Sequence, residues 1–347
     1  MHAEQSHSTA SVAGADTSAD GVAQLRYLAT RVNEALAAQA YPSQPEGLYE
    51  PIRYTLEGGG KRIRPVLLLT AAAAYGASYE QALPAAIALE TYHNHTLLHD
   101  DLMDQAELRR GRPTVWTKWD ANTAVLSGDT MLLRAMKLLS DCTCERWAEL
   151  YQLYVDTFVQ VCEGQQMDMN FEQVGADSVS IGEYIEMIRL KTSVLVACAA
   201  KAGGIIADAD AADCNLLYAF AEKVGLAFQL QDDMLEVWGD PAVFGKANGG
   251  DIACGKKTYP LLCALSAAHG SQRAELLQLI ASRESDEAER IRRVTAIYEQ
   301  LGVKQACEEA IAAYYDEAQT FYQLLPLPES AKSPLWQWAV QLMGREK

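Results

Sequence analysis

The sequence predicts an all-α protein, and three features of its 347 residues support this fold class. Ala and Leu are abundant while aromatic residues make up only 8% of the chain, and this composition favours helix over strand. Helix-period apolar patterns follow one another from Val22 onward almost without interruption. Alternating strand patterns bounded by turn residues are essentially missing from the sequence.

Gly and Pro residues mark the joints between the expected helices. In chain order, these helices cover residues 22–40, 47–58, 65–76, 79–103, 118–140, 145–172, 181–190, 192–206, 210–238, 257–268, 271–283, 286–301, 303–325 and 330–344. Pro42 and Pro45 follow the first helix, and the three glycines at 58–60 follow the second. Gly111 and Pro113 separate the fourth helix from the fifth.

In the second half of the chain, Gly175, Gly239 and the glycine pair at 249–250 separate further helices. No linker divides the chain and no short repeat is present, so residues 21–347 are expected to form one helical domain around a central cavity. Residues 1–20 are rich in Ser, Thr, Ala and Asp and lack an apolar core. They are expected to be a disordered tail rather than a signal or transit peptide.

The charge and hydropathy of the chain exclude several classes of partner. The net charge of −17 argues against binding to nucleic acid or to an anionic membrane surface. The longest apolar run, residues 66–77, is shorter than the roughly 20 residues that a membrane span needs, so no stable membrane insertion is expected. The eight cysteines form no Cys-x-x-Cys pair, which fits reduced thiols in a cytoplasmic protein.

Two acidic motifs share one spacing. The first comprises Asp100, Asp101 and Asp104, and the second comprises Asp232, Asp233 and Glu236. Positions i and i+4 lie one turn apart on one face of a helix, with i+1 beside them. Either motif alone could be a solvated face of an acidic protein, but both follow apolar, core-type helix. Clustered like charges repel one another, so a cation is expected between them, and carboxylates with room for water suit Mg²⁺.

The scarce basic residues gather near these motifs. Lys61 and Arg64 follow the glycines at 58–60, Arg109 and Arg110 follow the first acidic motif, and Lys246 and Lys256 follow the second. A nucleotide-binding P-loop is excluded because Lys61 precedes Arg rather than Ser or Thr. Arg binds phosphate oxygens in bidentate fashion and Lys supplies a mobile charge. Anion sites beside metal sites predict a substrate that carries diphosphate.

Several ordered motifs complete this pattern. They are residues 59–65 (GGKRIRP), residues 98–113 with the first acidic motif and its arginines, Gly164-Gln165, Lys191-Thr192, and residues 228–258 with the second acidic motif. In this order they resemble the motifs of the trans-isoprenyl diphosphate synthases, the family of farnesyl and geranylgeranyl diphosphate synthases. The resemblance covers about residues 47–263 and implies the isoprenoid synthase fold. The sequence departs from the family pattern at Glu236, where Asp is usual, and at Trp116, where His is common.

The resemblance implies a prenyltransferase of isoprenoid biosynthesis. An allylic diphosphate ionises, isopentenyl diphosphate attacks the carbocation, and the departing diphosphate takes the proton. The metal ligands would be Asp100, Asp101, Asp104, Asp232, Asp233 and Glu236, holding three Mg²⁺ ions with bound diphosphate. Lys191, Lys246, Lys256 and Arg109 would bind the allylic diphosphate, and Lys61, Arg64, His93 and Arg110 would bind isopentenyl diphosphate. Thr192 and Gln229 would face the reacting carbons. A cytoplasmic homodimer is also implied.

Product length depends on the helix that carries the first acidic motif. In the family, the pocket for the growing tail runs back along this helix, and side chains there form its floor. Thr96, His95 and Tyr92 lie four, five and eight residues before Asp100. A floor closed by His95 and Tyr92 predicts a short product. Because no two-residue insertion lies between Asp101 and Asp104, geranylgeranyl diphosphate is expected, with farnesyl diphosphate as the alternative.

Other functions fit the sequence less well. His95 and His99 at i and i+4 could bind zinc, but the acidic motifs and arginines favour Mg²⁺ and diphosphate. A terpene cyclase does not need a second diphosphate site, and an HD-type phosphohydrolase would act without an acceptor. A non-catalytic subunit of a heteromeric prenyl synthase should have lost an acidic motif, and this chain keeps both.

Overall fold

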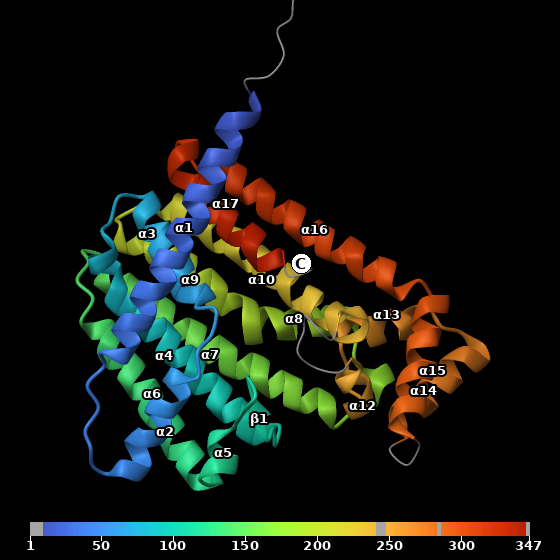
Figure 1. Cartoon of the computed structure of the whole chain (residues 1–347). Helices are drawn as coiled ribbons and strands as arrows, with labels where there is room; N and C mark the ends of the chain where they lie inside the picture. Colours follow the sequence, from blue (N-terminus) through green and yellow to red (C-terminus); the bar gives the residue numbers. More distant parts are fainter. Residues whose placement is uncertain (1–9, 241–247, 283–285, 345–347) are drawn as a thin grey trace, which may run out of the picture. The chain divides into compact units, whose positions relative to one another are not determined.

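The computed structural model describes residues 10–240, 248–282 and 286–344, and these are almost entirely helical (Figure 1). The helices are α1 (Ala10–Ala37), α2 (Glu46–Glu57), α3 (Ile63–Ala74), α4 (Tyr79–Met103), α5 (Val115–Lys118), α6 (Ala121–Ser140), α7 (Trp147–Glu172), η1 (Ala176–Ser178), α8 (Ile181–Ile188), η2 (Arg189–Ser193), α9 (Val194–Ile206), α10 (Ala211–Trp238), α12 (Gly250–Cys254), α13 (Tyr259–Ala267), α14 (Gly270–Ala281), α15 (Glu287–Gln300), α16 (Val303–Leu324) and α17 (Glu329–Met343). The all-α prediction is therefore confirmed. Within the described ranges, no helix combines the length and apolarity of a membrane span.

Three of the differences between the observed elements and the expected ones concern the first half of the chain. The first helix begins at Ala10 rather than at residue 22, so it extends into the segment expected to be a tail. The helix expected at 118–140 begins at Ala121 instead, because Trp119 leaves the helical conformation and Asp120 caps α6, while Val115–Lys118 form the separate short helix α5. Two short strands, β1 (Leu108–Arg109) and β2 (Arg112–Pro113), form an antiparallel ribbon that the sequence did not predict.

The chain forms two compact units. The first contains the chain up to Tyr151 together with Ala199–Cys214 and Pro326–Trp338. The second contains Gln152–Cys198, Asn215–Leu325 and the residues from Ala339 onward. Most of the boundaries between them fall inside helices rather than in a linker.

In the first unit, α4 packs against α3 and α6, and small residues set how closely. A Cβ added at Gly128 of α6 would lie 2.1 Å from His99 Nε2 of α4, so the glycine makes room for the imidazole. A Cβ at Gly203 of α9 would lie 2.5 Å from the carbonyl oxygen of Leu68 in α3. Because protein cores are close-packed, Gly128 sets how closely α6 approaches α4, and Gly203 sets how closely α9 approaches α3.

In the second unit, α13, α15 and α16 pack on one another, and α12 and α14 contact α15. Leu261, Leu276, Val294, Tyr298 and Cys307 are buried in the shared core of these helices. A smaller core joins α8 to α10 and α13. These two cores anchor the helices on which the second acidic motif and the Lys191-Thr192 motif lie.

Candidate active site

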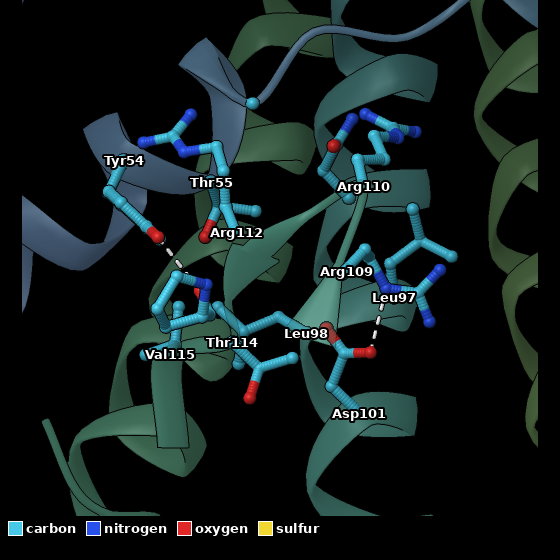
Figure 2. Close-up of a pocket in the computed structure, with 13 residues that line it drawn as sticks. Tyr54, Thr55, Leu97, Leu98, Asp101, Arg109, Arg110, Arg112, Thr114 and Val115 are labelled. Atoms are coloured by element: carbon cyan, nitrogen blue, oxygen red, sulfur yellow. Dashed lines mark hydrogen bonds and ion pairs between the residues drawn. The ribbon is translucent and has the colours of Figure 1, made fainter. Parts of the chain in front are cut away.

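The first acidic motif lies at the C-terminal end of α4. Asp100 is in the last turn and Asp104 caps the helix, with the Asp104 amide donating to the Asp100 carbonyl at 2.8 Å. Asp101 is buried, and its Oδ1 accepts a hydrogen bond from Arg109 Nε at 2.7 Å (Figure 2). Arg109 Nη2 lies 3.6 Å from Asp100 Oδ2. One guanidinium thus contacts two of the three carboxylates.

A tight hairpin presents the arginines that follow this motif. Arg110 and Gly111 have φ values of 54° and 73°, so both central residues of the turn are left-handed, as in a type I′ hairpin. Strands β1 and β2 pair Arg109 with Arg112. The ribbon leaves no signal in the sequence because two-residue strands carry no alternating pattern.

Trp116 has a structural role beside this hairpin. Its indole Nε1 donates a hydrogen bond to the carbonyl oxygen of Ala106 at 2.9 Å. Thr114 Oγ1 donates to the same oxygen at 2.7 Å. The tryptophan therefore ties α5 to the segment between α4 and the ribbon, which the sequence alone did not explain.

A cavity lies between α2, α4 and the ribbon, with Arg109, Arg110 and Arg112 among its lining residues (Figure 2). Arg112 stacks on Tyr54, its Cζ 4.0 Å from the ring centroid, and the Tyr54 hydroxyl donates to the Pro113 carbonyl at 2.8 Å. The three arginines are thus held in place by Asp101, by the glycine segment and by Tyr54 respectively.

The glycine segment holds Arg110 next to Lys61 in the fold. Arg110 Nη1 donates to the carbonyl oxygen of Gly59, and a Cβ at Gly60 would lie only 3.0 Å from the same nitrogen. Gly59 and Gly60 have φ values of 75° and 140°, which residues with a side chain rarely adopt. The glycines are therefore required both for the local backbone and for the approach of Arg110.

Arg64 and His93 form a hydrogen-bonded pair. Arg64 Nη1 lies 3.2 Å from His93 Nε2, and burial lowers the pKa of Arg64 to about 10. Burial also lowers the pKa of His93 well below its ordinary value, and Arg64 lowers it further. A neutral His93 accepts from Arg64 at Nε2 and so carries its proton on Nδ1. Arg64 Nε is buried and has no hydrogen-bond partner within the described residues.

Arg62, which the sequence did not single out, anchors the start of α3. It is 4% exposed and its φ is 51°. Its guanidinium donates to Glu90 Oε1 at 2.7 Å, to Asn33 Oδ1 at 2.8 Å and to the Leu56 carbonyl at 2.9 Å. Each of its three guanidinium nitrogens donates a hydrogen bond, and this buried ion pair holds the backbone next to exposed Lys61 in one conformation. Its burial and these partners distinguish it from Lys61, and neither is visible in the sequence.

The residues expected to limit product length are neighbours on α4, with Tyr92 about one turn before His95 and Thr96. Tyr92 and His95 are buried, their ring centroids 5.5 Å apart, and His95 Nδ1 donates to the Gly128 carbonyl at 2.9 Å. Thr96 is half-buried and its hydroxyl donates to the His93 carbonyl at 2.8 Å. His99 Nε2 donates to the Val125 carbonyl at 3.2 Å. Both imidazoles thus donate hydrogen bonds to carbonyl oxygens of α6, which argues against the zinc alternative.

In the second unit, Lys191 and Thr192 lie in a π-helical turn, η2. Two glycines make room for this turn. A Cβ at Gly164 of α7 would lie 2.3 Å from the Lys191 amide nitrogen, and one at Gly225 of α10 would lie 3.0 Å from Ser193. Single π-turns in α-helices are frequent at functional sites. The Gly164-Gln165 motif is thus explained by the close approach of α7 to η2.

Lys191 pairs with an acid that the sequence analysis did not name. Its Nζ donates to Asp168 Oδ2 at 2.6 Å, and Asp168 is 8% exposed. Asp168 lies one turn after Gly164 on α7, so its spacing from the Gly164-Gln165 motif could have identified it from the sequence. The pair holds the ammonium group in one place.

The second acidic motif lies near the C-terminal end of α10. Asp233 is buried, and burial raises its pKa to about 7 although hydrogen bonds from Tyr184 and Gln229 oppose the shift. Glu236 is half-buried, and its Oε1 would lie 2.7 Å from a Cβ at Gly250. Gly250 has no side chain and therefore leaves room for Glu236, which is longer than the Asp that is usual at this position.

Three other residues of the expected site are Asp232, Lys256 and Lys246. Asp232 is half-buried on α10, and Lys256 follows α12, where its amide donates to the Asp251 carbonyl at 2.9 Å. Lys246 lies outside the described residues. Within the described ranges, no group of three His, Cys, Asp or Glu side chains is close enough to enclose a metal ion.

Stability in the absence of metal should depend on the ionisation of Asp101. Burial raises the pKa of Asp101 to about 6, although Arg109 opposes the shift. Between about pH 4 and pH 6 the folded state therefore keeps a proton that the unfolded chain releases, so the free energy of unfolding should fall as pH rises through this window. We expect Asp101→Asn to reduce this fall by about 1–2 kcal/mol in urea titrations with chelator present. Equal slopes for both proteins would contradict the expectation.

Comparison with known proteins agrees with this arrangement of residues. The profile of the polyprenyl synthetase family matches residues 45–300. A geranylgeranyl diphosphate synthase from Methanosarcina mazei is 38% identical over 245 residues, which cover 70% of this chain and 75% of that protein. A geranylgeranyl pyrophosphate synthase from Geoglobus acetivorans is 42% identical over 235 residues, covering 67% and 73%. A crystal structure of a geranylgeranyl pyrophosphate synthase superposes with a TM-score of 0.88 at 42% identity, covering 93% of this chain and 99% of that one.

Proposed function

The chain belongs to the polyprenyl synthetase family, and we propose that it makes geranylgeranyl diphosphate. It is a prenyl diphosphate synthase, a transferase. The C–O bond of an allylic diphosphate breaks to give a carbocation and diphosphate. The double bond of isopentenyl diphosphate attacks the cation to form a C–C bond. A proton then leaves the adjacent carbon, and we assign the departing diphosphate as its acceptor.

One observation in the first unit carries the choice of a synthase over a cyclase. Arg109 is held by the carboxylates of the acidic motif, whereas Arg110 is held by the glycine segment next to Lys61. Arg64, with its unpartnered Nε, and neutral His93 add to the second group. Two cationic groups with separate anchors suit two diphosphates, whereas a cyclase binds only one. We assign the Arg110 group to isopentenyl diphosphate and Arg109 to the allylic substrate.

The donor set of the first motif fits Mg²⁺. Asp100 and Asp104 offer hard oxygens one turn apart, and Asp104 is exposed. Mg²⁺ in proteins typically uses one or two carboxylates together with substrate phosphates and water. When bound, it would neutralise the charge that develops on the leaving diphosphate. Asp101, already paired with Arg109, would keep that guanidinium directed at the same place.

The second unit would supply the remaining ligands of the allylic diphosphate. Asp232 and Glu236 would hold metal, and Lys191 and Lys256 would bind phosphate oxygens, joined by Lys246 from outside the described residues. Lys191 is already fixed by Asp168, so little side-chain freedom would be lost on binding. Thr192 and Gln229 would present oxygen dipoles to the carbocation. Removing charge from the leaving group and stabilising the cation are electrostatic contributions, the largest that such a site can make.

The proposed product length depends on Tyr92 and His95. Both rings are buried and packed on each other, and burial lowers the pKa of His95 to about 4, so its ring is neutral at physiological pH. Fixed, uncharged rings are suitable walls for an apolar tail. Tyr92 lies about one turn deeper than His95, which would leave room for a twenty-carbon product. A homodimer in the cytoplasm is part of the same proposal, and retention of both acidic motifs argues against a non-catalytic subunit.

A product assay tests the proposal. Purified protein with Mg²⁺ and labelled isopentenyl diphosphate would receive dimethylallyl, geranyl or farnesyl diphosphate in turn. Geranylgeranyl diphosphate from all three would support the proposal. Products that stop at farnesyl diphosphate would keep the chemistry and place the floor at His95 alone. Release of diphosphate without elongation would indicate a hydrolase or cyclase, and no reaction would favour a non-catalytic subunit.

Shortening one wall of the tail pocket should lengthen the product. His95→Ala should add a product one isoprene unit longer, because Tyr92 then becomes the first barrier. Tyr92→Ala should lengthen the product as well, because Tyr92 closes the pocket about one turn deeper. Thr30→Ala, at an exposed position of α1, is the control and should leave product length as it was. An unchanged product from His95→Ala would overturn the assignment of the floor.

A further inference from the structure

A buried chain of hydrogen bonds in the second unit connects Tyr184 to the residues assigned to the carbocation. We propose that Tyr184 is a positioning residue, which orients the Gln229 amide and the Thr192 hydroxyl through Asp233. The inference rests on the proposed function, because it gives these two dipoles their task. It also gives Asp233 a role different from that of Asp232 and Glu236 in the same acidic motif.

Each link of the chain has a defined donor and acceptor. Thr192 Oγ1 donates to Gln229 Oε1 at 3.2 Å, and Gln229 Nε2 donates to Asp233 Oδ1 at 3.2 Å. The Tyr184 hydroxyl donates to Asp233 Oδ2. Tyr184 and Asp233 are 2% and 5% exposed, so the contact between them is shielded from water, while Thr192 and Gln229 are half-buried.

The carboxylate fixes the direction of the whole chain. Asp233 Oδ1 accepts from the NH₂ group of Gln229, so the carbonyl of the same amide is directed toward Thr192. Thr192 then donates its only proton to that carbonyl, which leaves its lone pairs free to face positive charge. One carboxylate thereby sets the orientation of both dipoles.

Both oxygens of Asp233 are engaged in this task. Oδ1 accepts from Gln229, and Oδ2 accepts from Tyr184 and from the Tyr259 amide, the last at 3.4 Å. The tyrosine hydroxyl is therefore the buried side-chain contact that prevents the carboxylate from turning. Without it, the long contact with the Tyr259 amide is the hydrogen bond that remains to Asp233 Oδ2 within the described residues.

The π-turn η2 explains how one continuous stretch of helix supplies both end residues of this series of hydrogen bonds, Tyr184 and Thr192. In an α-helix, positions i and i+7 share a face, and a π-turn adds one residue to that count. Thr192 lies within η2, eight residues after Tyr184, so the wider turn brings Thr192 toward the Tyr184 face. Their partners Gln229 and Asp233 are one turn apart on α10. Tyr184 thus contacts Asp233, and Thr192 contacts Gln229 one turn away on the same helix.

The first test is Tyr184→Phe, which removes one hydroxyl and keeps the ring. We expect kcat to fall about tenfold while the KM for isopentenyl diphosphate changes less than twofold, because the cationic group assigned to that substrate is untouched. Tyr298→Phe, a change of the same kind at another buried tyrosine of the second unit, should leave both values within twofold. An unchanged kcat for Tyr184→Phe would overturn the proposal.

A double-mutant cycle separates positioning from a general effect on folding. In a Gln229→Ala background the dipole that Tyr184 orients is absent, so adding Tyr184→Phe should lower kcat by less than twofold. A purely structural role would lower kcat by the same factor in both backgrounds and would contradict the inference. Thr192→Ser should retain most of the activity and Thr192→Val should lose it, because only the hydroxyl is needed.

A crystal structure of Tyr184→Phe tests the positioning without reference to activity. We expect the Asp233 carboxylate to turn and the Gln229 amide to leave hydrogen-bond distance of it. Unchanged side chains at both positions would refute the inference even if the enzyme elongates prenyl chains. If the wild-type protein makes no prenyl product, the proposed function fails, while this structural result still decides the role of Tyr184. If Tyr184→Phe does not fold, Gln229→Glu replaces it, because a second carboxylate facing Asp233 should displace the side chain.

Discussion

Asp104→Ala should lower kcat by about 10³-fold without reducing the free energy of unfolding. Asp104 caps the C-terminal end of α4 and is exposed, one turn after Asp100. A carboxylate at this end of a helix is unfavourable for stability, because it faces the negative end of the helix dipole and a second carboxylate. The helix dipole and Asp100 therefore oppose an acid here, whereas a bound metal ion would favour one. The loss should appear in kcat for every allylic substrate.

Asp141 provides the matched control for this substitution. It caps the C-terminal end of α6 with nearly the same backbone conformation, φ −81° and ψ −8° against φ −80° and ψ −3° for Asp104, and it is also exposed. Asp141→Ala should leave kcat within twofold. The measurements are steady-state elongation rates at several Mg²⁺ concentrations and thermal unfolding of both variants. If Asp104→Ala retained more than a tenth of the activity, Asp104 would not be a metal ligand.

The positions that carry charge were predictable because each lies in a motif with a fixed spacing. The helix expected at residues 79–103 is α4 as observed, with Ser78 as its N-cap. The hydroxyl of Ser78 accepts from the Gln81 amide at 3.2 Å, and such caps leave a local signal in the sequence. The spacing of Asp100 and Asp104 then places both carboxylates on one face. Local chemistry sufficed for these features.

The supporting residues were not predictable because their partners are distant in sequence. Arg62 and Glu90 are 28 residues apart, and Tyr184 and Asp233 are 49 apart. Neither pair follows from a helical period, and a single sequence carries no information on which buried charges meet. The same holds for the π-turn, because its extra residue is set by Gly164 and Gly225 on other helices. The sequence shows which charged residues are present, but it does not show the packing that orients them.

Gly164→Ala should show how much the reaction depends on that packing. The added Cβ would lie 2.3 Å from the Lys191 amide nitrogen and 2.7 Å from Lys191 Cα, and backbone atoms cannot rotate away from it. Either α7 or η2 must move, and overpacking of this kind typically costs about 1–3 kcal/mol. Because Lys191 and Thr192 both lie in η2, we expect kcat to fall about 100-fold through misplacement alone.

Gly182→Ala separates this effect from the general consequence of adding a methyl group to a helix. At Gly182 in α8 the nearest atom to an added Cβ is Ser180 Oγ at 4.0 Å, so the methyl group meets no obstacle. This variant should be more stable by about 0.5–1 kcal/mol, since Ala is the better helix former, and kcat should stay unchanged. Thermal unfolding and elongation rates of the two variants decide the matter. Wild-type kcat in Gly164→Ala would mean that the position of Lys191 and Thr192 tolerates a shift of η2, and both residues would then lose their assigned roles at the reacting carbons.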